Sequence, residues 1–125
     1  MNLYVIVDNN TIIDKYYKGE PALSFYIEDN DCKILFDTGY SDIFLENARK
    51  MGINLCDIDC IVLSHGHNDH TCGLQYLMNF EFKISYIFAQ RDTLGLGELS
   101  LFSGTLFSFQ GFQPAQVAGG LTVCR

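Results

Sequence analysis

Basic side chains are scarce in this chain: its 125 residues include 8 lysines and arginines against 15 aspartates and glutamates. Proteins that bind nucleic acid use lysine and arginine to neutralise phosphates, so this balance argues against a nucleic-acid partner. No stretch approaches the roughly 20 apolar residues that span a bilayer. Residues 1–10 also lack the basic region and small-residue cleavage site of a signal peptide. We therefore expect a cytoplasmic protein without nucleic-acid or membrane partners.

Cysteine occurs five times, an odd number, and at irregular spacings. This does not suit a disulfide framework, and most of these residues are expected to be small buried apolar side chains. Cys56 and Cys60 have the spacing of a metal knuckle, but the chain offers no second pair to complete the four ligands of a structural zinc site. Ordinary core cysteines are therefore the favoured interpretation of this pair.

Apolar side chains make up 48% of the chain, which is enough for the core of one globular unit. Helical periodicity predicts one helix over residues 43–51, with Ser41 or Asp42 as N-cap and Gly52 just beyond its end, and a shorter helix over 73–80. Strand patterns occur at residues 3–7, 22–28, 32–36, 60–63 and 83–88. Strands that alternate with helices in this order predict an α/β fold.

The composition changes near residue 90. Residues 91–125 contain four charged residues, no lysine and six of the eleven glycines, and neither a helical nor a strand period continues there. Two interpretations stay open: a glycine-rich, loop-rich C-terminal region, or a tail that is not native to the domain before it, for example after truncation or a frameshift. We therefore divide the chain into a domain at 1–90 and a tail at 91–125.

The histidines form the most informative pattern in the sequence. All three, His65, His67 and His70, fall within six residues together with Asp69, directly after the buried-type strand 60–63. Imidazoles two residues apart on an extended segment point to the same side, so His65 and His67 can share one metal ion. Asp69 and His70, further along the loop, can then reach a second ion. The spacing thus favours a two-metal site at the carboxyl end of a strand.

A structural role is the alternative for these residues, because surface loop histidines, or core histidines that bond to backbone carbonyls, need no metal. We also expect Gly66 and Asn68 to tolerate unusual backbone angles that such a loop requires.

Two separated motifs carry a resemblance to a known family. The sequence Leu-Ser-His-Gly-His-Asn-Asp-His-Thr-Cys-Gly-Leu at 63–74 resembles the His-x-His-x-Asp-His signature of the metallo-β-lactamase superfamily. The sequence Ile-Leu-Phe-Asp-Thr-Gly at 34–39 resembles its upstream strand motif. Segments 22–28 and 47–53 are similar to the branch of dihydropterin ribofuranosyl-aminobenzene phosphate synthase-like proteins. The resemblance covers roughly residues 1–90.

This resemblance implies an α/β fold that is half of a four-layer αββα metallo-β-lactamase sandwich, with residues 1–90 as the N-terminal half. In the family, the second half supplies further metal ligands, whereas this sequence has no histidine after His70. One face of the sheet would then lack its partner, which favours dimerisation or aggregation. A homodimer could rebuild a sandwich, but without the ligands of the second half.

The implied site is a pair of metal ions. His65 and His67 would ligate one ion, Asp69 and His70 the other, and Asp69 could also move a proton as a catalytic residue. Zinc is the default metal, while iron and manganese are used on similar sites. Asp37 would support the metal loop as a hydrogen-bond acceptor, or else it is a turn residue that caps the following loop.

The expected function is metal-dependent hydrolysis of a small ester or phosphorylated substrate by metal-activated water. With two ligands per ion, where a tight catalytic zinc has at least three, we expect this chain to be weak or inactive. The alternative is a non-catalytic fragment that binds metal loosely or acts as an interaction module. Cys72 departs from the glycine expected at its position, and its thiol would lie close to the site, where a buried inert thiol is the favoured interpretation.

Overall fold

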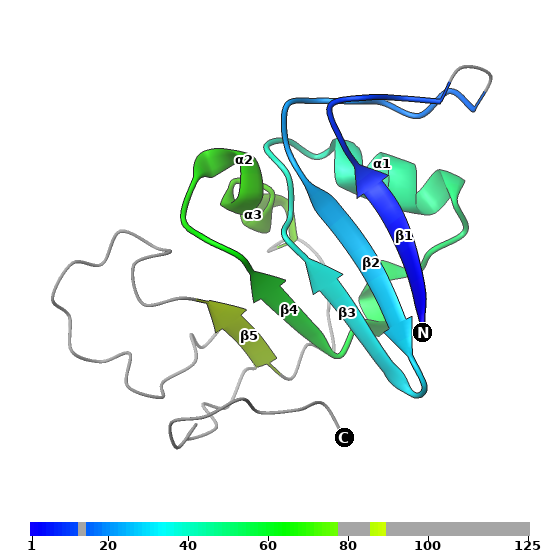
Figure 1. Ribbon diagram of the computed structural model, residues 1–125, viewed down its shortest axis with the longest axis vertical. Helices are drawn as coiled ribbons and strands as arrows, with labels where there is room; N and C mark the ends of the chain where they lie inside the picture. Colours follow the sequence, from blue (N-terminus) through cyan, green and yellow to red (C-terminus); the bar gives the residue numbers. More distant parts are fainter. Residues whose placement is uncertain (13–14, 78–85, 90–125) are drawn as a thin grey trace, which may run out of the picture.

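The computed structural model describes residues 1–12, 15–77 and 86–89. Within these residues a five-stranded mixed sheet has the order β1-β2-β3-β4-β5 (Figure 1). The first three strands pair antiparallel, whereas β3, β4 and β5 pair parallel to one another. Their bounds are Asn2–Val7 for β1, Ser24–Asp29 for β2, Cys32–Phe36 for β3, Cys60–Leu63 for β4 and Tyr86–Ala89 for β5.

The strand predictions are confirmed where residues are described. Strands β1 to β4 fall on the four segments that the apolar pattern indicated, and β5 covers the end of the fifth. The β2-β3 hairpin turns at Asn30, whose φ of 53° lies in the left-handed region that asparagine tolerates better than most residues. Residues 83–85 of the predicted fifth strand and all of 91–125 lie outside the described residues.

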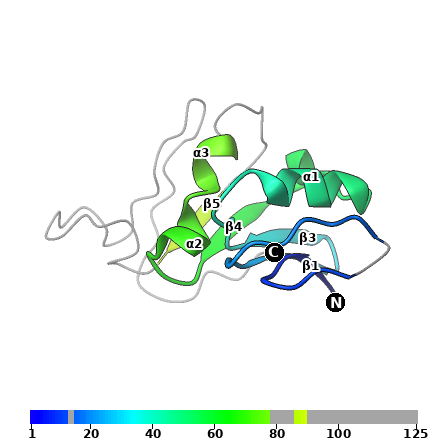
Figure 2. The same ribbon diagram turned by 90° about the horizontal axis from the view of Figure 1, so that it is seen from above.

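Among the described residues, four short helices, one of them a 3-10 turn, follow β3 and β4. Helix α1 (Ile43–Lys50) joins β3 to β4 together with the 3-10 turn η1 (Leu55–Asp57), and α2 (Asn68–Thr71) and α3 (Leu74–Leu77) follow β4. The prediction of α1 is confirmed, and α3 lies within the predicted 73–80 helix, of which 78–80 is outside the described residues. Helices α1 and α3 lie on the same side of the sheet, as the view from above shows (Figure 2).

Both residues expected to cap α1 lie at its start, and the Ser41 hydroxyl oxygen accepts from the N–H of Ile43 at 3.4 Å. Asp42 is the N-cap, but its side chain makes no capping hydrogen bond. The hydroxyl of Ser41 donates instead to Glu20 Oε2 at 2.6 Å, and Glu20 Oε1 accepts from the backbone N–H groups of Tyr40 and Ser41 at 2.8 and 3.1 Å. A carboxylate that is distant in sequence thus satisfies the loop before the helix.

The hydrophobic core lies between the sheet and helix α1. Tyr26 pairs with Leu35 and Leu35 with Ile61 across three strands, and all three side chains are at most 3% exposed. Phe44 and Ala48 of α1 are buried in the same cluster. The two residues are four apart and therefore lie on one face of the helix, which explains why its apolar period was readable in the sequence.

The buried side chain of Asn47 in α1 forms hydrogen bonds with the segment before β2. Its Nδ2 donates to the carbonyls of Ile6 and Lys18 at 2.8 and 2.7 Å, and its Oδ1 accepts from the N–H of Lys18 at 3.0 Å. The side chain thereby satisfies backbone groups that no strand partner reaches. An exposed ion pair between Lys18 and Glu46 at 2.8 Å accompanies this contact.

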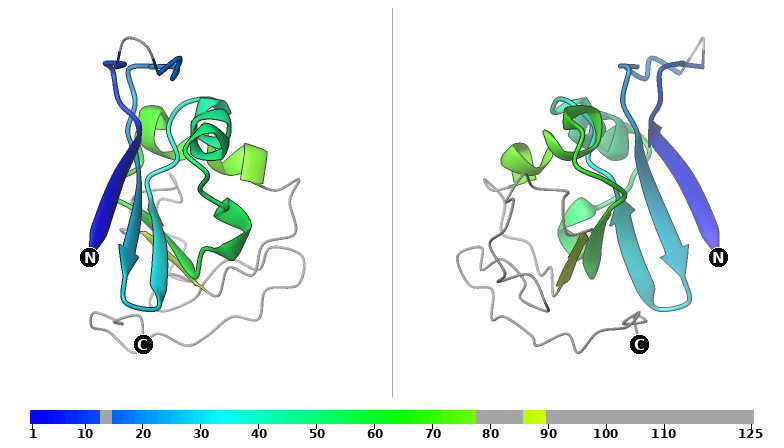
Figure 3. Two further views of the ribbon diagram at one scale, coloured as in Figure 1. Left: turned by 90° about the vertical axis from the view of Figure 1, so that its right-hand side faces the viewer. Right: turned by 60° about the vertical axis from the view of Figure 1, so that its left-hand side comes forward.

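The opposite face of the sheet is also apolar. Leu3 and Val5 are 53% and 47% exposed, and the rings of Phe25 and Phe36 stack with centroids 6.3 Å apart. In the described part of the chain no helix covers this face, as the two side views show (Figure 3). The row of apolar residues on this face consists of Leu3, Val5, Phe25, Ile27, Ile34, Phe36 and Val62. Dimerisation through it stays a prediction.

Tyr26 predicts how stability depends on pH. Its hydroxyl donates to Glu28 Oε1 at 3.0 Å, and burial raises its pKa well above the ordinary value. A phenol whose pKa is raised on folding contributes stability that is fully present below the unfolded pKa of about 10 and is lost as the pH rises further.

We therefore expect the thermal midpoint to decrease as the pH rises above about 10, and to decrease less in Tyr26→Phe. Thermal unfolding followed by circular dichroism at several pH values measures this. Tyr16→Phe is the matched control, because Tyr16 is 86% exposed. An equally steep fall in Tyr26→Phe and in the unaltered protein contradicts the prediction.

No helix in the described segments is long and apolar enough to cross a membrane.

Candidate metal centre

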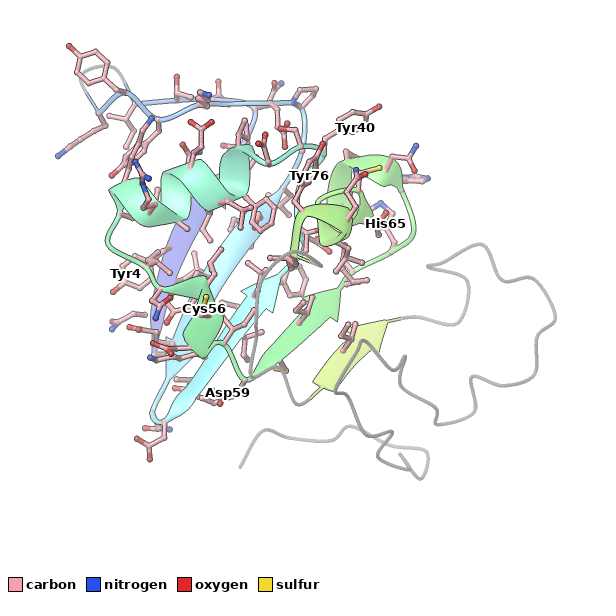
Figure 4. The ribbon with its side chains drawn as sticks, turned by 180° about the vertical axis from the view of Figure 1, so that it is seen from behind. Tyr4, Tyr40, Cys56, Asp59, His65 and Tyr76 are labelled. Atoms are coloured by element: carbon pink, nitrogen blue, oxygen red, sulfur yellow. The ribbon has the colours of Figure 1, made fainter. Side chains whose placement is uncertain are left out.

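The histidine motif lies at the carboxyl end of β4, beside the carboxyl end of its parallel neighbour β3. The N–H of Asp37, just after β3, donates to the carbonyl of Val62 in β4 at 2.8 Å and so extends the pairing by one residue. His65 lies at this end of the sheet, whereas Cys56 and Asp59 lie at the other (Figure 4). Parallel strands commonly place their binding sites at their carboxyl ends, because the connecting loops gather there.

The motif contains two pairs of potential metal-binding atoms, and the two atoms of each pair lie close together. His65 Nε2 and His67 Nδ1 are 3.0 Å apart, and His70 Nε2 and Asp69 Oδ2 are 3.3 Å apart. The ring centroid of His65 lies 4.6 Å from that of His67 and 4.1 Å from that of His70. The structure therefore brings together all four residues that the sequence selected, as two pairs in one cluster.

The donor set suits a transition metal, but each pair is only half of a complete shell. Nitrogen atoms bound to one tetrahedral zinc at about 2.0 Å lie a little over 3 Å apart, close to the spacing of the His65 and His67 nitrogens. Among the described residues, no group of three or more histidine, cysteine, aspartate or glutamate side chains could hold a metal ion. Two ligands per ion is the number expected from the sequence, and ligation by these residues stays a prediction.

Asp37 is the buried anchor of the cluster. It is 0% exposed, its Oδ2 lies 2.8 Å from His70 Nδ1, and its Oδ1 accepts from the N–H of Ser64 at 2.8 Å. Its backbone takes a φ of 55°, a left-handed conformation that aspartate adopts more readily than most residues. The carboxylate contacts a histidine of the motif directly, which is the arrangement expected of a residue that supports the metal loop.

A close contact between two loops fixes the position of the second pair. Thr38 donates to the carbonyl of His70 through both its N–H and its hydroxyl, at 2.8 and 3.0 Å. The N–H of Gly73 donates to the carbonyl of Gly39 at 3.0 Å. A Cβ built on Gly73 would lie 2.7 Å from the carbonyl carbon of Thr38, so only glycine fits here.

The loop itself differs from the expectation in two respects. Asp69 and His70 lie not on an irregular loop but on the helical turn α2, whose N-cap is His67. Gly66 and Asn68 have no left-handed backbone conformation, so the expectation for them was wrong. The residues with positive φ near the site are Asp37 and Gly39, since the sharp turn follows β3 rather than β4.

Neither Cys56 nor Cys72 forms a hydrogen bond with the described histidines. Cys72 forms no disulfide and is partly buried in the turn after α2, where its N–H donates to the carbonyl of Asn68 at 3.0 Å. Cys56 is on η1, at the far end of the sheet from His65 (Figure 4).

Sequence reasoning gave no role to Ser64 and Thr38, although both are part of the network around the site. The Ser64 hydroxyl lies 2.7 Å from Asp37 Oδ2 and 2.9 Å from His65 Nδ1. A hydroxyl residue directly before the first histidine, at the end of an apolar strand, is the signal that could have indicated this contact. This signal can be interpreted only when the buried carboxylate of Asp37, at the end of the neighbouring strand β3, is known.

The fold is α/β, and imidazoles and carboxylates lie together at the carboxyl ends of two parallel strands. These two features are typical of a metal-binding α/β protein. The family model of the metallo-beta-lactamase superfamily matches residues 17–116, and the chain belongs to this superfamily. The suspected family is thereby confirmed, and so is its α/β fold, of which the described residues cover a part.

Curated relatives are similar over most of this chain. The uncharacterized protein MJ0448 of Methanocaldococcus jannaschii is 35% identical over 88 residues, which are 70% of this chain and 34% of that protein. The 7,8-dihydropterin-6-methyl-4-(beta-D-ribofuranosyl)-aminobenzene-5'-phosphate synthase of the same organism is 37% identical over 94 residues, 71% of this chain and 32% of that protein. This chain thus spans about a third of the length of these relatives.

A solved structure shares the fold. Tm1679, a metal-dependent hydrolase of the beta-lactamase superfamily, is 40% identical and superposes with a TM-score of 0.52, over 60% of this chain and 26% of that one. The match to the larger protein is therefore partial, as it is for the curated relatives.

Proposed function

We propose that this chain binds divalent transition-metal ions, zinc first among them, through His65 with His67 and through Asp69 with His70. The facing nitrogens of His65 and His67, 3.0 Å apart, carry this proposal. Two imidazole nitrogens in such proximity have little reason to meet unless a proton or a cation lies between them. Iron and manganese are the alternative metals at the same ligands.

The chain's residues would prepare this site for hydrolysis. A bound ion would lower the pKa of water and polarise the substrate's carbonyl or phosphoryl oxygen. Asp37 orients His70 from the buried side, which leaves Nε2 of that ring facing Asp69. Asp69, whose side chain is 40% exposed, can also accept and return a proton at Oδ2.

A small phosphorylated or ester compound is the substrate class that we propose. The superfamily includes hydrolases, and a relative named for the synthesis of an aminobenzene 5'-phosphate supports the phosphorylated choice. Because this chain spans about a third of such relatives and offers two ligands per ion, we expect weak turnover or none from the chain alone.

Zinc titration tests the proposal. We expect the unaltered chain to bind zinc, and His67→Ala to bind it at least about tenfold more weakly, because loss of a direct ligand should cost no less than loss of a supporting residue. Isothermal titration calorimetry gives both dissociation constants. Asn68→Ala is the matched control, since Asn68 is the exposed neighbour on the same turn. Equal zinc affinity in the unaltered chain and in His67→Ala contradicts the proposal.

A second candidate is a non-catalytic interaction module, favoured by the partly exposed apolar face of the sheet. Hydrolysis of a generic phosphodiester or lactone by the zinc-loaded chain separates the two. Turnover that His67→Ala abolishes supports the hydrolase, whereas a chain that neither binds zinc nor turns over supports the module.

A further inference from the structure

Ser64 occupies a position between the buried carboxylate and the first histidine. Its hydroxyl oxygen lies 2.7 Å from Asp37 Oδ2 and 2.9 Å from His65 Nδ1, and its N–H donates to Asp37 Oδ1 at 2.8 Å. The backbone contact places Ser64 against Asp37 whatever its side chain is. The hydroxyl is therefore the only part of Ser64 that links the carboxylate to His65.

The direction of these hydrogen bonds follows from the chemistry of the three groups. A carboxylate only accepts hydrogen bonds, so the hydroxyl hydrogen of Ser64 is directed to Asp37. A hydroxyl that donates its one hydrogen can only accept from its other neighbour, so His65 Nδ1 must carry the hydrogen in that contact. In a neutral imidazole Nε2 is then the lone-pair nitrogen, and this is the atom that faces His67 Nδ1.

Asp37 acts on the two imidazoles by different routes. Its Oδ2 lies 2.8 Å from His70 Nδ1 and therefore orients that ring directly. It orients His65 through the Ser64 hydroxyl. The hydroxyl is 3.4 Å from His70 Nδ1, a longer contact than the one to His65, so its main effect falls on His65.

We propose that Ser64 is a positioning residue that selects the Nδ1–H tautomer of His65 and so presents Nε2 to the cation. This inference rests on the proposed metal-binding function for its purpose, but not for the tautomer itself. Neutral imidazole in water favours hydrogen on Nε2, so the Ser64 hydroxyl reverses the intrinsic preference. Removal of the hydroxyl leaves Nε2 protonated in part of the molecules, and those molecules cannot bind a cation there without a tautomer change.

Nitrogen-15 NMR of the metal-free chain, at a pH where the imidazoles are neutral, reads the tautomer directly. We expect the Nδ1–H form of His65 in the unaltered chain, a shift toward the Nε2–H form in Ser64→Ala, and a return in Ser64→Thr, which restores a hydroxyl. Zinc affinity should fall about tenfold in Ser64→Ala and recover in Ser64→Thr. Circular dichroism checks that each variant is folded.

Ser24→Ala is the matched control, because the Ser24 hydroxyl donates to the backbone carbonyl of Asp37 at 2.9 Å and belongs to the same buried region. It should leave the His65 tautomer unchanged. An unchanged tautomer in a folded Ser64→Ala overturns the inference. If the unaltered chain binds no zinc but Ser64→Ala still changes the tautomer, the metal-binding proposal fails while the action of Ser64 on His65 stands.

Discussion

Gly73→Ala is expected to destabilise the chain by about 3 kcal/mol and to abolish zinc binding, because overpacking against a rigid backbone has few ways to relax. The added methyl would overlap the carbonyl of Thr38 and lie 2.9 Å from its Cβ. Thr38 holds the carbonyl of His70, so any movement that relieves the overlap also displaces that histidine. Urea denaturation and zinc titration measure the two effects.

Gly52→Ala is the matched control, because it measures the cost of replacing a glycine without the steric overlap. Gly52 has a φ of 76° and nothing within 4 Å of an added Cβ, so its replacement introduces only backbone strain of about 1 kcal/mol. Zinc affinity should not change in Gly52→Ala, which alters the end of α1. If Gly73→Ala is as stable as Gly52→Ala, the two loops are not in the contact described.

Asp37→Asn is expected to lower stability by about 2 kcal/mol, the usual worth of a hydrogen bond to a buried charged group. Asparagine tolerates the left-handed backbone at position 37, so the main change is chemical. The carboxylate has donors on both oxygens, from Ser64 and His70. Whichever way the side-chain amide at position 37 is turned, its NH2 group therefore faces a hydrogen-bond donor, and one hydrogen bond is lost.

Zinc affinity should fall about 10- to 100-fold in Asp37→Asn, as observed when the partners that orient metal ligands are removed. The altered amide favours hydrogen on His70 Nε2, the nitrogen that faces Asp69. Asp59→Asn is the matched control: Asp59 Oδ2 accepts from the N–H of Lys33 at 2.7 Å, a bond that an amide oxygen can also accept, at the other end of the sheet. Unchanged zinc affinity in Asp37→Asn would show that Asp37 does not orient His70 for metal binding.

Local patterns were sufficient for the order of the elements and for the choice of metal-binding candidates. Strand β4 has four consecutive apolar residues because its side chains are largely buried on both faces of the sheet, and α1 has an apolar period because one face packs on the sheet. The α2 turn was missed, because a four-residue helix that contains polar side chains has no period to detect. The carbonyls of Asp69 and His70 in this turn accept from the N–H groups of Leu23 and Thr38, which are distant in the sequence.

The contact between Asp37 and the histidine motif could be expected only from the family resemblance, not from local pattern. Asp37 and His70 are far apart in sequence, and their meeting depends on the parallel pairing of β3 with β4. The same pairing gives Ser64 its two partners and makes glycine necessary at position 73. A side-chain contact between two loops cannot be predicted from the sequence of either loop alone.

The amino-acid sequence by itself determined the α/β order of elements, the family and the four candidate ligands, since each depends on residues that are close together along the chain. Only the tertiary structure decided which nitrogen of each histidine faces its partner, that Asp37 is a buried anchor and that Ser64 connects it to His65. These features depend on distances between atoms from separate segments. Those distances are fixed by packing and strand register, not by the order of the residues.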